Sequence, residues 1–169
     1  MKASGLEVFE LAALCLAVSL VPIAVLDARK RAAPALPLVL VSLAGAAMNA
    51  AFAVRYSLTP VQLQQLLMSL GFLALCVLMA LARWVGGGDA LAYTAAFCVD
   101  PFNRLHAAEH SPLAVAPPFP CVLALSLGLA LYIHKILYSS REAPLAVYTV
   151  ASLCTVRILL TAAALARAR

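Results

Sequence analysis

The sequence predicts an all-α polytopic membrane protein with about six transmembrane helices, and three observations support this prediction. Of the 169 residues, 65% are apolar and only 11% are charged, whereas a soluble domain averages about 45–50% apolar and about 25% charged residues. The mean hydropathy is +1.01. A soluble fold of this length has too little interior to bury so much apolar surface. The apolar residues also fall into long separate runs, so the lipid bilayer is the expected solvent.

Most of these runs reach the roughly 20 residues that a helix needs to cross about 30 Å of hydrocarbon. A segment in lipid must satisfy its own backbone hydrogen bonds, so helices are expected. Short connections and the lack of an internal repeat predict one membrane-embedded domain over residues 1–169. The expected helices cover residues of about 6–26, 34–54, 62–82, 87–99, 115–133 and 144–166.

The fourth expected helix, about 87–99, is too short for a relaxed span, because its residues rise only about 20 Å. One end of this helix must therefore be recessed, or the bilayer must thin around it. A recessed end gives water access to a site within the membrane boundary.

The basic residues predict the orientation of the chain. Arg29, Lys30 and Arg31 follow the first apolar run instead of preceding it, which is the reverse of a secretory signal. By the positive-inside rule, the end of the first helix faces the cytoplasm and the N-terminus lies outside. The predicted location is the cell membrane, with several passes.

The formal net charge of +5 does not indicate nucleic-acid binding, because the basic residues are scattered between apolar runs. The five cysteines lie in apolar stretches without a CxxC pair, which argues against a disulfide framework and a structural zinc site. His106, Glu109 and His110 match the inverted zinc-protease pattern HxxEH. They lie in a short loop between two prolines without an evident third ligand, so we predict no metal and no cofactor.

The chain contains only three aspartates, and two of them are expected at one membrane face. Asp27 ends the first expected helix, which runs inward, and Asp89 begins the fourth, which runs outward. Asp100 ends the fourth helix about 16 Å away, on the opposite face. Topology therefore pairs Asp27 with Asp89 and excludes Asp100.

Two carboxylates at one site cannot both ionise cheaply, so they share a proton. This is the requirement of an aspartic peptidase, in which one carboxylate activates a water and the other protonates the scissile carbonyl oxygen. Asp89 at a helix N-terminus is the expected ionised partner, and Asp27 near a helix C-terminus is the expected protonated one.

A glycine run, Gly86, Gly87 and Gly88, directly precedes Asp89. Three consecutive glycines are poor helix formers. They let the backbone turn sharply and approach a substrate strand closely. We therefore predict an active-site loop over these residues.

Gly86-x-Gly88-Asp89 resembles the GxGD motif of membrane aspartic peptidases, and the segment from Leu26 to Pro34 resembles the first-aspartate segment of type IV prepilin peptidases. The order and spacing of the two motifs are similar to the archaeal branch that processes preflagellins (archaellins) and pilin-like precursors. The resemblance implies an endopeptidase with Asp27 and Asp89 as its catalytic pair. Its substrates would be precursors with a short basic leader, cleaved at the cytoplasmic boundary. Leu91 and Ala35 depart from the lysine and asparagine that many relatives carry, and the cysteine-rich methyltransferase insert of large bacterial relatives is missing.

Two other functions remain open from the sequence. A small membrane transporter could use Asp27 and Asp89 for proton or cation coupling, although it does not need the glycine run. An intramembrane peptidase of presenilin type is the other alternative, but those proteins are larger and their aspartates lie deeper.

Arg157 lies midway along the last expected helix, where a charge costs at least about 2.5–3.5 kcal/mol on insertion scales. We predict that it faces the bundle interior, against a carbonyl or a carboxylate, and name it a candidate supporting residue for the site.

Overall fold

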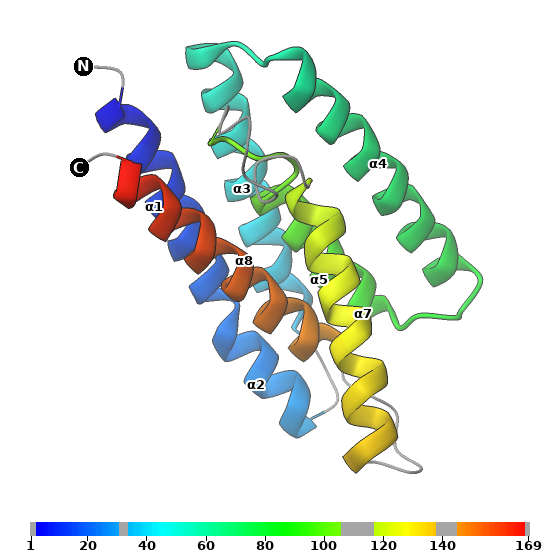
Figure 1. The fold of residues 1–169 in the computed structure, drawn as a ribbon. Coiled ribbons are helices and arrows are strands. Elements are labelled where there is room, and N and C mark those ends of the chain that lie inside the picture. The colour runs from blue at the N-terminus through cyan, green and yellow to red at the C-terminus, as the bar shows by residue number, and fades with distance from the viewer. Residues whose placement is uncertain (1–2, 31–33, 106–116, 138–144, 168–169) are drawn as a thin grey trace.

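The computed structural model describes residues 3–30, 34–105, 117–137 and 145–167. Within these ranges the chain is helical and contains no strand, which confirms the predicted fold class (Figure 1). The helices are α1 (Ala3–Ser19), α2 (Val21–Lys30), α3 (Ala35–Tyr56), α4 (Pro60–Leu81), α5 (Gly87–Val99), α7 (Pro118–Leu137) and α8 (Leu145–Arg167).

Five helical stretches in the described part of the chain are long and apolar enough to cross a membrane. The predicted count of about six is close, because the fourth expected helix is the 13-residue α5, which is too short to be counted among these five stretches. The predicted bounds agree with the observed ones within a few residues. The five stretches that are long and apolar enough to cross a membrane are Gly5–Arg29, Ala35–Tyr56, Pro60–Leu81, Pro118–Ile136 and Leu145–Ala166.

The first span differs from the single helix that the sequence predicts. It is interrupted at Leu20, between α1 and α2. The Leu20 amide bonds to the Ala17 carbonyl, three residues back, instead of continuing the α-helical pattern. Pro22 follows, and because a proline has no N–H, it cannot make the next hydrogen bond of a continuous helix.

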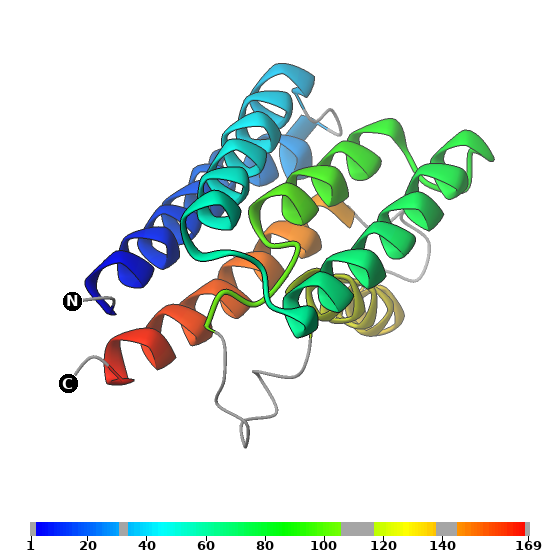
Figure 2. The ribbon, with the colours of Figure 1, turned by 90° about the horizontal axis from the view of Figure 1, so that it is seen from above.

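Helix α5 lies in the middle of the bundle (Figure 2), in contact with α1, α3, α4, α7 and α8. Its alanines at positions 92, 95 and 96 are at most 2% exposed. A helix too short to span the membrane can be this apolar because its sides pack against other helices. Asp89 is therefore carried by a central helix that packs against α1, α3, α4, α7 and α8.

Helix α4 stands apart from α3 and packs on α5 and α7 (Figures 1 and 2). Its first turn has a capping box between Thr59 and Gln62. Three buried polar side chains then bind the backbone that follows α5. The Gln62 amide donates to the Asn103 carbonyl (3.1 Å), and Ser69 Oγ donates to the Pro101 carbonyl (2.6 Å). Gln65 Oε1 accepts from the Asn103 amide (3.0 Å).

Helices α3 and α5 approach so closely that only glycine fits at position 45. A Cβ on Gly45 would lie 2.6 Å from the Cys98 carbonyl oxygen and 2.7 Å from its carbon. One turn later, Asn49 Nδ2 donates to the same Cys98 oxygen (2.7 Å). Small residues at helix crossings give this close contact in membrane proteins.

Gly45→Ala is expected to destabilise the protein by about 1–3 kcal/mol, because the added methyl group meets rigid backbone and must push α3 and α5 apart. Thermal unfolding in detergent, followed by circular dichroism, measures this loss. Gly71→Ala in α4 is the matched control, since a Cβ there meets nothing within 4 Å. Equal melting temperatures for the two variants would contradict the close contact.

Candidate functional site

Asp89 lies in the first turn of α5, whose N-cap is Gly86. Its Oδ1 accepts a hydrogen bond of 2.8 Å from the backbone amide of Ala146, in the first turn of α8. The positive end of the α5 dipole and this amide both favour a negative charge on Asp89. The carboxylate thus links the N-terminal ends of α5 and α8.

The sharp turn before Asp89 lies at Arg83, ahead of the glycine run, and the role of Gly86, Gly87 and Gly88 as an active-site loop stays a prediction. Arg83, with φ of 60°, takes the left-handed conformation, and none of the described glycines has a positive φ. Gly87 and Gly88 instead form the first turn of α5. The low helix propensity of glycine destabilises a helix when the glycine lies in its interior. Gly87 and Gly88 lie in the first turn, where the backbone amides have no partner within the helix in any case.

Glycine at position 86 nevertheless leaves room for the carboxylate. A Cβ built there would lie 3.3 Å from Asp89 Oδ2, whereas a Cβ on Gly87 meets nothing within 4 Å. Gly86, the first glycine of the motif, therefore lies against the Asp89 carboxylate, whereas Gly87, the middle position, has room for a side chain.

Asp27 lies on α2 and is 9% exposed. Helices α1 and α2 run antiparallel to α8: Glu10 pairs with Arg157, and further along the chain the Ala17 carbonyl accepts from Cys154 Sγ at 3.5 Å. Continued in the same direction, α2 reaches the start of α8, against which it packs. Asp27 and Asp89 therefore lie toward the same end of the bundle.

Arg157 faces two carboxylates, as the sequence predicts for a buried arginine. Its Nη1 is 2.8 Å from Glu10 Oε2, and its Nη2 is 2.8 Å from Asp100 Oδ1. It lies eleven residues, or about 16 Å, along α8 from Ala146. Any support that Arg157 gives to Asp89 therefore acts through the helices.

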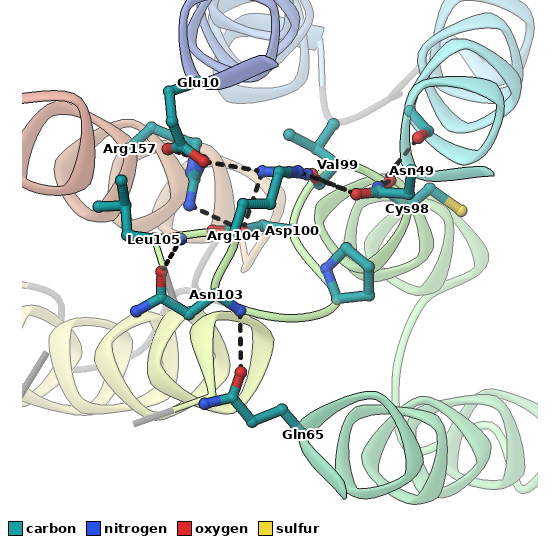
Figure 3. A network of polar contacts seen from close by, with 12 residues as sticks. Glu10, Asn49, Gln65, Cys98, Val99, Asp100, Asn103, Arg104, Leu105 and Arg157 are labelled. Atoms are coloured by element: carbon teal, nitrogen blue, oxygen red, sulfur yellow. Dashed lines mark hydrogen bonds and ion pairs between the residues drawn. The ribbon is translucent and has the colours of Figure 1, made fainter. Parts of the chain in front are cut away.

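Sequence reasoning missed two members of the ion-pair group around Arg157, the carboxylate of Glu10 and the second cation Arg104. Glu10 and Arg104 complete what we call the four-charge cluster: Glu10, Asp100, Arg104 and Arg157 (Figure 3). Arg104 Nη1 is 3.6 Å from Glu10 Oε1 and 3.7 Å from Asp100 Oδ1. All four residues are at most 1% exposed. The acid inside the first apolar run, Glu10, was the available sign of a buried partner.

Asn49 of α3 extends the four-charge cluster. Its Oδ1 accepts from Arg104 Nε (3.1 Å) and Nη2 (2.7 Å), and Arg104 Nη2 also donates to the Val99 carbonyl. The cluster thus connects α1, α3, α8 and the segment that follows α5. Asp100 takes part in it, at the end of α5 remote from Asp89.

The described residues contain no group of three or more His, Cys, Asp or Glu side chains that could hold a metal ion. His106, Glu109 and His110 lie outside the described residues. The cysteines at positions 15, 76, 98, 121 and 154 are free thiols.

Comparison with known proteins gives no family model that matches the chain, and no significant match to a curated protein or to a solved structure. The function is therefore inferred from the residues of this chain and their geometry.

Proposed function

We propose that this chain is a membrane aspartic endopeptidase of the GxGD type, similar to archaeal prepilin and preflagellin peptidases. It removes the short basic leader from pilin-like or archaellin precursors at the cytoplasmic membrane boundary. The observation that supports this most is the common position of two buried or half-buried carboxyl groups. Asp27 and Asp89 lie toward the same end of the bundle, near the start of α8.

In this mechanism the two aspartates share one proton around a catalytic water. Asp89 is the base, because the α5 dipole and the Ala146 amide stabilise its charged form. Asp27, near the C-terminal end of α2, is the acid that donates to the scissile carbonyl oxygen. The water attacks the carbonyl carbon while Asp89 accepts its proton, so neither a covalent intermediate nor a metal is required.

The orientation follows the basic residues after Asp27. With Arg29, Lys30 and Arg31 in the cytoplasm, both aspartates face the inner boundary of the membrane and the N-terminus lies outside. A precursor whose basic leader stays in the cytoplasm and whose apolar segment enters the bilayer presents its cleavage site at this level.

Cleavage in lipid vesicles tests the proposal. The purified chain is reconstituted with a synthetic precursor that carries a short lysine-rich leader ahead of a hydrophobic segment, and products are identified by mass spectrometry. We expect one cut between the leader and the hydrophobic segment, and none in vesicles without the chain. An intact precursor would contradict the proposal and favour the transporter alternative, which proton or cation flux in the same vesicles would then report.

The glycine positions give a matched pair of variants for this assay. Gly86→Ala is expected to lower kcat about tenfold, because its methyl group presses on Asp89 Oδ2 and small displacements of a catalytic group are costly. Gly87→Ala is expected to cleave like the wild type, since its methyl group has open space. Equal loss in both variants would show that helix propensity, and not contact with Asp89, decides the effect.

A further inference from the structure

Helices α5 and α8 are joined at two points that have the same spacing on both helices. Asp89 Oδ1 accepts from the Ala146 amide (2.8 Å) at one end, and Asp100 Oδ1 lies 2.8 Å from Arg157 Nη2 at the other. Asp89 and Asp100 are eleven residues apart, as are Ala146 and Arg157. Eleven residues make about three turns of helix, so both contacts of each helix lie on one face.

The contact at the Asp100 end cannot shift easily. Arg157 binds two different helices at once, Glu10 of α1 with Nη1 and the end of α5 with Nη2. All three side chains are at most 1% exposed. Separating one charge from this group leaves an uncompensated ion in a medium of low polarity, which is strongly unfavourable.

Arg104 is a second cation that holds the Asp100 carboxylate in place. It lies four residues after Asp100, with its Nη1 3.7 Å from Asp100 Oδ1. Its other guanidinium nitrogens bind Asn49 Oδ1 on α3 and the Val99 carbonyl (Figure 3). The last turn of α5 is thus held against α1, α3 and α8 by contacts at the same height in the bundle. The first turn of α5, by contrast, contains two glycines.

We propose that the Asp100–Arg157 pair, with Glu10 and Arg104 around it, fixes the register of α5 against α8 and so sets the level of Asp89. Arg157, Glu10 and Asp100 are then positioning residues for the candidate catalytic end, about 16 Å away along either helix. The effect on cleavage rests on the proposed function, but the register itself does not.

Hydrogen exchange at the Ala146 amide reports the register, because this amide bonds to Asp89 only when the two helices are aligned. Exchange is measured by mass spectrometry with electron-transfer fragmentation in the wild type, Arg157→Lys and Arg157→Met. Asp89→Ala gives the rate of an Ala146 amide without its carboxylate partner. Arg157→Lys keeps the positive charge, and hence the fold. A single ammonium group does not reproduce the contact of two separate guanidinium nitrogens with Glu10 and Asp100.

We expect Ala146 to exchange about tenfold faster in Arg157→Lys, and close to the Asp89→Ala rate in Arg157→Met, with amides of α7 unchanged. Arg55→Met, at the exposed end of α3, is expected to behave like the wild type. Wild-type exchange at Ala146 in both Arg157 variants would overturn the proposal. Equal acceleration in α7 would also overturn it, because it would mean general loosening.

Precursor cleavage gives an independent second readout. If Arg157 sets the level of Asp89, Arg157→Lys lowers kcat and leaves KM near the wild-type value, since the lysine changes the alignment of Asp89 and not a substrate contact. A rise in KM alone would contradict this role. A wild-type protein that fails to cleave would contradict the proposed function, while the exchange result would still decide the register.

Discussion

Asp89→Asn and Asp27→Asn are each expected to abolish cleavage of a leader-bearing precursor. An asparagine keeps the shape of the side chain but can neither accept the proton of the attacking water nor donate an acidic proton. General acid–base catalysis contributes about 10²–10⁴-fold, so cleavage in either variant should fall by at least this factor. Initial rates in lipid vesicles, followed by mass spectrometry of the released leader, measure the loss.

The double variant distinguishes a shared site from two separate roles. Residues that act as a unit are not additive, so Asp27→Asn combined with Asp89→Asn should cleave no more slowly than either single variant. Glu7→Gln is the matched control, because it makes the same acid-to-amide change in α1, away from the two aspartates. A doubly substituted protein that still trims the precursor would end the aspartic-peptidase proposal.

The helices could be predicted because hydropathy and length suffice to define spans in a membrane. Helix α5 has the bounds that the sequence predicts, since the glycine run at its start and Pro101 after its end limit the apolar run. The break near Leu20 was missed because Pro22 lies within an otherwise unbroken apolar run, and many membrane helices continue past a proline.

The candidate site was predictable where it depends on topology alone. Helix direction is enough to bring Asp27 and Asp89 toward one end and Asp100 toward the other. The four-charge cluster was not predictable in the same way, because Glu10 and Arg157 are 147 residues apart in the chain. The turn at Arg83 was missed because glycine is the usual residue for a left-handed conformation, and here the local strain falls on an arginine.

The second large effect is expected on stability. Arg157→Met is predicted to destabilise the protein by about 3–5 kcal/mol, because it leaves two buried carboxylates, Glu10 and Asp100, with Arg104 as their remaining cation. Glu10→Gln leaves two buried arginines with one carboxylate and is expected to cost a similar amount. Unfolding in detergent, followed by circular dichroism against denaturant, gives the free energy of each variant.

Combining Glu10→Gln with Arg157→Met should cost clearly less than the two single changes together, because Asp100 and Arg104 remain as a balanced pair. Arg55→Met, at the exposed end of α3, should change stability by no more than about 0.5 kcal/mol. Strictly additive losses would mean that Glu10 and Arg157 stabilise the fold separately. If the double variant loses less stability than the two single variants together, the ion pairs that contribute most to the stability of the bundle lie at the end of α5 remote from Asp89. The candidate catalytic carboxylate could then keep a polar, hydrated surrounding without carrying the stability of the fold.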